Sequence, residues 1–184
     1  LNPEFLASFI ADPHALKPGT TMPNLFQGKN KSERINDAIA ITHFLTSRTN
    51  NKFTPAKTDA ASITRGDELF HSLGCVACHA PRDPTSQETT LGQSIPLGEL
   101  GVKYSRTGLV EFLENPHAVR PSGRMPNMSL TNRESQDVAA FLLQKAPESV
   151  NLWKTDPDLA GNGKQLFMDA NCGACHQGVL PSTE

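Results

Sequence analysis

Apolar side chains recur at helical spacing in the middle of the chain, and capping residues mark the ends of the helices. Ile63 and Phe70 share one side of a helix that the spacing predicts for residues 60–73. Asp59 is a suitable N-cap for this helix, and Gly74 can end it.

Two further helices follow from the same pattern. Leucine and phenylalanine form an apolar stripe over residues 105–114, and Pro116 prevents that helix from continuing. The last helix is predicted for residues 131–145, because Thr131 and Glu134 form a capping box at its start. No strand pattern competes with these helices, so the predicted fold class is all-α.

Polar segments separate the helices. Residues 82–87 are too rich in turn formers for a regular element, which predicts a surface loop. Residues 49–55 and 146–149 are polar and contain proline, which is typical of linkers between domains.

Composition excludes some classes of partner. The chain is 37% hydrophobic and 20% charged, as in globular proteins. Its net charge is −2 and its Lys and Arg residues are not clustered, so no nucleic-acid or anionic-membrane partner is predicted. No stretch approaches the roughly 18 consecutive apolar residues of a membrane span.

The pattern Cys-x-x-Cys-His occurs twice, at residues 75–79 and 172–176, and contains all four cysteines of the chain. It is the attachment signal for c-type haem, because two thiols at this spacing can each add to a vinyl group of one porphyrin. The adjacent imidazole can then bind the iron. The predicted ligands are Cys75, Cys78 and His79 for one haem c, and Cys172, Cys175 and His176 for a second.

Two other readings of the cysteine pairs compete. Paired Cys-x-x-Cys knuckles also bind zinc, but usually with a short loop between them, whereas these pairs lie almost a hundred residues apart. A thioredoxin-like redox pair needs a preceding strand, and no run of β-branched residues supplies one. Haem attachment is therefore the preferred interpretation.

An electron-transfer haem needs a second axial ligand, and a methionine thioether is a soft, neutral donor that raises the potential. Met125 lies on an irregular segment between two predicted helices and is the candidate, with Met128 as a weaker rival. The alternative is that Met125 fills a gap in the core.

The middle of the chain resembles a class I cytochrome c domain, of the kind found in multi-domain bacterial multi-haem proteins. Gly66 and Phe70 before the first motif, Met125-Pro126 after it and Phe141 on the last helix carry the resemblance. It implies that the first and last helices cross at Gly66 and that Phe70 touches Phe141. It also implies redox partner proteins and a periplasmic or otherwise exported location, and we expect a leader that this chain does not show.

Charged and titratable residues near Met125 are further candidates. Arg120 and Arg124 could pair with haem propionates, since guanidinium matches carboxylate geometry, or they could be solvated surface charges. His14 and His117 occupy equivalent proline-flanked turns and are interpreted as polar or capping residues, although a bis-His site stays open.

Parts of the sequence recur along the chain. Residues 163–176 align with residues 66–79 at a shift of about 97, and residues 2–24 align with residues 105–127 at a shift of about 103. The predicted domains are residues 1–50 as the C-terminal half of a cytochrome c module, residues 51–157 as a complete module, and residues 158–184 as the N-terminal half of a further module.

The two flanking halves are complementary. The first has Met22 but no cysteine motif, whereas the second has the motif but no methionine after it. Either half alone would expose an apolar helix face, so we expect them to pair within one chain or between chains. His176 and Met22 would then bind the second haem. The alternative is a tandem array whose neighbouring halves were cut away.

These observations predict electron transfer by a c-type, di-haem cytochrome with His/Met ligation, as a fragment of a larger redox protein. An iron ligated on both sides has no free position for a substrate, which argues against an enzyme. The competing hypotheses are a peroxidase-type haem oxidoreductase with one open iron position, and a docking segment whose haem only anchors the fold.

Overall fold

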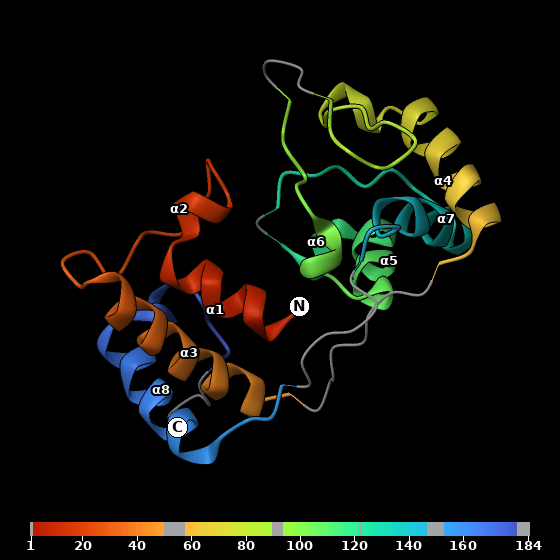
Figure 1. Cartoon of the computed structure of the whole chain (residues 1–184). Helices are drawn as coiled ribbons and strands as arrows, with labels where there is room; N and C mark the ends of the chain where they lie inside the picture. Colours follow the sequence, from red (N-terminus) through yellow and green to blue (C-terminus); the bar gives the residue numbers. More distant parts are fainter. Residues whose placement is uncertain (1, 50–57, 90–93, 122, 147–152, 180–184) are drawn as a thin grey trace. The chain divides into compact units, whose positions relative to one another are not determined.

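The computed structural model describes residues 2–49, 58–89, 94–121, 123–146 and 153–179. The chain divides into two units (Figure 1): unit 1 is Phe53–Val150, and unit 2 combines Asn2–Lys52 with Asn151–Glu184. The described residues form helices and isolated β-bridges without a β-strand, which confirms the all-α prediction.

Unit 1 is built from helices that begin where the sequence predicts them. Its elements are α4 (Ala60–Ser72), η1 (Cys75–Ala77), η2 (Leu100–Val102), α5 (Arg106–Glu114), α6 (Pro116–Val119) and α7 (Asn132–Leu142). Asp59 caps α4 by accepting the Ser62 N–H at 2.9 Å, and Thr131 with Glu134 forms the capping box of α7. Helix α7 ends at Leu142, before the predicted Lys145, and continues as a turn.

Helices α4 and α7 cross at a glycine. A Cβ atom on Gly66 would lie 1.9 Å from the carbonyl oxygen of Asp137, so no larger residue allows this approach. The rings of Phe70 and Phe141 meet beside the crossing with their centroids 5.7 Å apart, and both side chains are almost fully buried. The crossing and the aromatic contact implied by the resemblance are confirmed.

An ion pair also joins α4 to α7. Arg65 donates from Nε and Nη2 to the two carboxylate oxygens of Asp137, each at 2.7 Å. The Asp137 side chain is only 6% exposed, and its hydrogen bonds from Arg65 hold its pKa below the usual range. Such a bidentate contact fixes the register of the two helices.

Unit 2 contains helices from both ends of the chain. Its elements are α1 (Pro3–Ala11), α2 (Pro13–Leu16), α3 (Lys31–Ser47), α8 (Pro157–Asp169) and η3 (Cys172–Ala174). Asn2 caps α1 ahead of Pro3, and Asn30 with Glu33 forms a capping box on α3. Phe26, in the loop before α3, is buried in the core of this unit.

Helices α3 and α8 pack against each other as α7 and α4 do in unit 1 (Figure 1). A Cβ atom on Gly163 would lie 2.0 Å from the carbonyl oxygen of Ala40. The rings of Phe44 and Phe167 lie 5.5 Å apart and are buried. Two segments from opposite ends of the sequence therefore share one hydrophobic core.

The start of α8 is attached to α3 through a buried histidine. Asp156 caps α8, and its N–H donates to Nδ1 of His43 at 3.0 Å. The ring of Trp153 stacks on His43 with centroids 4.4 Å apart, and its indole N–H donates to Thr46. Residues 153–157 thus pack within unit 2.

This contact predicts that unit 2 loses stability in mild acid. Burial lowers the pKa of His43 below its ordinary value near 6.5, although Asp156 acts in the opposite direction. The unfolded chain therefore binds a proton as the pH falls below about 6.5 while the folded chain does not. Denaturation followed by the fluorescence of Trp153, the single tryptophan, should give full stability at pH 8 and less at pH 5.5.

The variant His43→Asn is the control for this prediction. Its side-chain oxygen can still accept the Asp156 N–H, but it does not titrate. Its stability should change less between pH 8 and pH 5.5 than that of the wild type. Equal pH dependence in the two proteins would show that His43 is not the titrating group.

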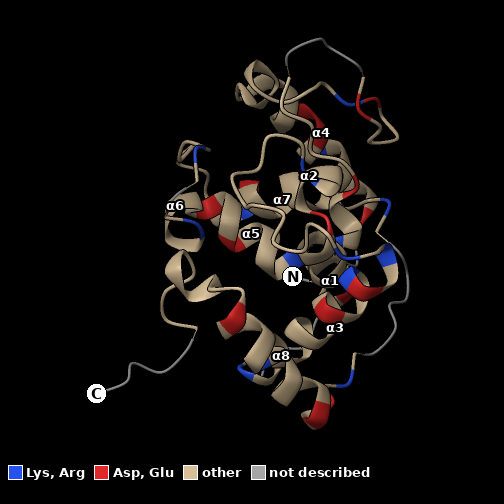
Figure 2. Ribbon diagram, turned by 90° about the vertical axis from the view of Figure 1, so that its left-hand side faces the viewer, with Lys and Arg blue, Asp and Glu red and all other residues tan. Residues whose placement is uncertain are grey.

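Charges of both signs are interspersed along the ribbon (Figure 2). Within the part of the chain that the structure describes, no helix is long and apolar enough to cross a membrane.

Candidate functional site

The first cysteine motif follows directly from the end of α4. Gly74 adopts φ 89°, in the left-handed region where a side chain is strained, and this ends the helix. The motif then forms the turn η1, in which the His79 N–H donates to the Cys75 carbonyl at 2.9 Å. Cys75 lies partly buried against the core, which raises the pKa of its thiol, while Cys78 is exposed.

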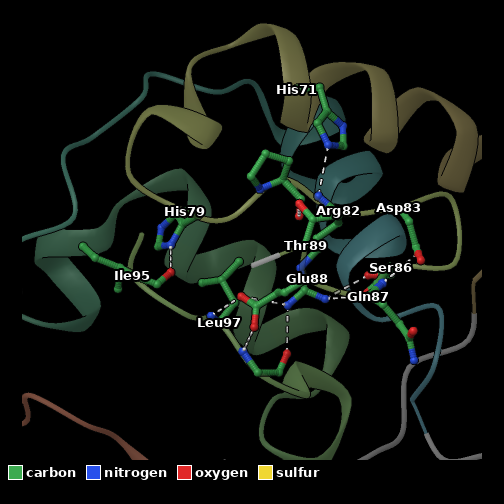
Figure 3. Close-up of polar contacts among 12 residues, drawn as sticks. His71, His79, Arg82, Asp83, Ser86, Gln87, Glu88, Thr89, Ile95 and Leu97 are labelled. Carbon is green, nitrogen blue, oxygen red and sulfur yellow. Dashed lines mark hydrogen bonds and ion pairs between the residues drawn. The ribbon is translucent and has the colours of Figure 1, made fainter. Parts of the chain in front are cut away.

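His79 has one ring nitrogen fixed by the backbone (Figure 3). Its Nδ1 lies 3.0 Å from the carbonyl oxygen of Ile95, and the Ile95 N–H donates to the Cys78 carbonyl at 2.7 Å. Because a carbonyl can only accept, Nδ1 must carry the proton of the neutral ring. The lone pair of Nε2 is then available for a metal.

Residues 82–87, in the loop after His79, form no regular element, and Pro84, Thr85 and Gln87 are exposed, as predicted for a surface loop, but two of its side chains turn inward. Arg82 and Ser86 are 7% and 5% exposed, and Arg82 Nη1 donates to both the carbonyl and the hydroxyl oxygen of Ser86. Arg82 Nη2 donates to the Gly98 carbonyl at 2.9 Å and lies 3.6 Å from the Glu88 carboxylate. The burial of Arg82 was not predicted, because a polar run contains no signal that one of its charges turns inward.

Met125 faces the same core as the first motif. It lies on the irregular segment between α6 and α7, and it packs against the buried cluster that also receives Cys75, Val76 and Leu97. Met128, the weaker rival, is partly buried and is not among the residues packed on that cluster. The structure thus brings Met125 and Cys75 to one core.

The arginines near Met125 differ from each other. Arg120 Nη2 donates to the Tyr104 hydroxyl at 2.6 Å, and its guanidinium lies over the rings of Tyr104 and Phe112 at 5.9 and 5.4 Å. Burial raises the pKa of Tyr104. Arg124 is exposed. Sequence reasoning did not identify Tyr104, because a lone tyrosine before a helix cap has no motif around it.

The second motif has the same local geometry in unit 2. Asn171, at φ 54°, takes the left-handed position that Gly74 takes in unit 1, and the turn η3 follows. Cys172 and Met22 pack against one core cluster, and burial raises the pKa of the Cys172 thiol. Cys175 and His176 are exposed.

The histidines at positions 14 and 117 lie on two short helices outside the cysteine motifs. His14 lies on α2 and His117 on α6, both exposed, and each short helix is capped by the side chain before its proline, Asp12 or Asn115. The described residues contain no group of three His, Cys, Asp or Glu side chains that could hold a metal ion.

The residues of unit 1 fit a covalently attached haem. Cys75 and Cys78 are free thiols at the spacing of the two vinyl groups, and His79 presents an unprotonated Nε2. Met125 offers a thioether from a different segment on the same core. Unit 1 thus supplies two thiols, an imidazole nitrogen and a thioether, which are groups that suit a covalently attached haem.

A comparison with protein-family models found one match: residues 63–146 match the family described as Cytochrome c. The matched segment lies within unit 1 and contains the first motif, Met125 and α7. Searches of curated proteins and of solved structures found no match.

Proposed function

We propose that unit 1 is a six-coordinate electron-transfer module, because residues 63–146 match the Cytochrome c family, whose members transfer electrons through covalent haem c. Cys75 and Cys78 would attach the haem, and His79 and Met125 would bind its iron. The observation that carries this proposal is the hydrogen bond from His79 Nδ1 to the Ile95 carbonyl, which frees Nε2 for the iron.

Bound haem supplies an iron that alternates between ferric and ferrous states while the protein around it changes little. The residues of this unit keep the iron from other ligands and hold it in an apolar setting. Met125 and Leu97 both pack on the buried cluster and would help to exclude water from a bound iron. Arg120, held by Tyr104 and Phe112, is placed to pair with a haem propionate, and Arg124 is a second, exposed candidate.

Unit 2 is the second haem module of the same chain. Cys172, Cys175 and His176 come from the segment after α8, and Met22 comes from the segment before α3. The contact of Gly163 with Ala40, and the packing of Cys172 and Met22 on one core, support pairing of the two halves within one chain. The protein then carries two haems with His/Met ligation.

Haem attachment of this kind takes place outside the bacterial cytoplasm, so the protein works in the periplasm or at another exported location. Its partners are redox proteins that approach a haem edge closely enough to exchange an electron. The interspersed charges in Figure 2 favour partners recognised by local contacts rather than by one strongly charged face.

Mass spectrometry of the chain, exported in a host with haem-attachment machinery, tests this proposal. The wild type should carry two covalent haems. The double variants Cys75→Ala/Cys78→Ala and Cys172→Ala/Cys175→Ala should each carry one. A wild type without covalent haem contradicts the proposed function, and a single haem confined to Cys75 and Cys78 contradicts the role of unit 2.

A further inference from the structure

Arg82 is a buried cation that binding a haem does not by itself explain. Its side chain is 4% exposed, and burial lowers its pKa, which Glu88 and Asp83 partly oppose. Taking a guanidinium out of water is costly unless hydrogen bonds and an opposite charge compensate. We therefore expect the hydrogen bonds of this buried arginine to position the groups around it.

The contacts of Arg82 lead to the segment that carries the Ile95 carbonyl (Figure 3). The Glu88 carboxylate accepts the N–H groups of Leu97 at 2.5 Å and Gly98 at 3.1 Å. Arg82 Nη2 donates to the Gly98 carbonyl at 2.9 Å. Glu88 therefore binds the N–H groups of residues 97 and 98, while Arg82 binds the carbonyl oxygen of residue 98.

The other end of this network is anchored to α4 and to the motif. The Arg82 N–H donates to Nε2 of His71 on α4 at 3.2 Å, and the backbones of Arg82 and Glu88 form an isolated antiparallel bridge. The position of the Ile95 carbonyl is thus set relative to the helix that delivers Cys75. No other described side chain makes a hydrogen bond to Leu97 or Gly98.

We propose that Arg82 and Glu88 are positioning residues that hold the Ile95 carbonyl on His79 Nδ1 and thereby tune the iron of unit 1. This inference rests on the proposed function, because it takes His79 as the iron ligand. A firm hydrogen bond at Nδ1 makes the imidazole a stronger donor at Nε2 and favours ferric iron. We call the contacts of Arg82 and Glu88 with residues 97 and 98 the clamp. Loosening the clamp should therefore raise the midpoint potential of the iron in unit 1 and let the His79 Nδ1 proton exchange with water.

Two variants test the clamp in the full haem-loaded chain. Arg82→Lys keeps the charge but loses the planar fork that reaches Ser86 and Gly98 together. Glu88→Gln keeps the shape but has only one acceptor oxygen for two N–H groups. In both, the midpoint potential of unit 1 should rise, and exchange of the His79 Nδ1 proton, followed by NMR, should accelerate on the order of tenfold or more.

Arg65→Met is the matched control, because it breaks an ion pair in the same unit whose described partners, Ser62 and Asp137, lie outside the clamp. It should lower stability and leave the potential and the His79 exchange rate unchanged. The clamp proposal is wrong if Arg82→Lys and Glu88→Gln behave like this control. A wild type without haem at Cys75 and Cys78 instead refutes the proposed function itself.

Discussion

Replacing Gly163 by alanine should destabilise unit 2 by about 2–3 kcal/mol, although alanine is the better helix former by about 1 kcal/mol. The added Cβ would lie 2.0 Å from the Ala40 carbonyl oxygen, which belongs to the backbone of α3 and cannot rotate away. Helices α3 and α8 would have to separate. Guanidinium denaturation followed by Trp153 fluorescence measures the loss, since Trp153 lies beside His43 on α3.

Gly161→Ala is the matched control in the same helix. Nothing lies within 4 Å of a Cβ atom built on Gly161, so this change should stabilise α8 by up to about 1 kcal/mol. A Gly163→Ala protein as stable as Gly161→Ala would contradict the packing of α8 on α3. The pairing of the segments that carry α3 and α8 would then no longer support a second haem module.

Replacing Met125 by leucine should open one iron to external ligands. Leucine keeps the volume but has no donor atom, so one haem should lose its weak far-red methionine band and bind carbon monoxide when reduced. Met22→Leu should do the same to the other haem. Visible spectra of the oxidised proteins and carbon monoxide titrations of the reduced proteins measure both effects.

The remaining two methionines serve as controls. Met128 is partly buried and is not packed on the core cluster that Met125 joins, and Met168 on α8 is 42% exposed. Leucine at either position should leave both far-red bands in place. Loss of a band in Met128→Leu but not in Met125→Leu would show that Met128, and not Met125, binds the iron.

The helices of unit 1 were predictable because local signals specify them, whereas their crossing was implied by the family resemblance. Asp59, Thr131 and Glu134 mark helix starts through short-range hydrogen bonds, and each makes the contact that its position predicts. Gly66 and Phe141 came from the family resemblance, and the close contact at Gly66 gives the physical reason for that glycine. The cysteine motifs could be recognised as haem-attachment signals because covalent attachment fixes the spacing of their residues.

The features that the sequence did not predict depend on contacts between residues far apart in the chain, which no local pattern encodes. Arg82 stands in a polar run that resembles any solvated loop, and only the fold brings Gly98 and Glu88 around it. His43 and Trp153 are 110 positions apart, so their stacking could not be inferred from either neighbourhood.

Carbon monoxide binding to the reduced, haem-loaded wild type tests most directly whether both irons are ligated on both sides by this chain. With His79 and Met125 on one iron and His176 and Met22 on the other, neither iron has a free position. The account predicts two haems per chain, a far-red band from each and no binding of carbon monoxide. Binding of carbon monoxide by either haem would contradict it and would favour an oxidoreductase with an open iron.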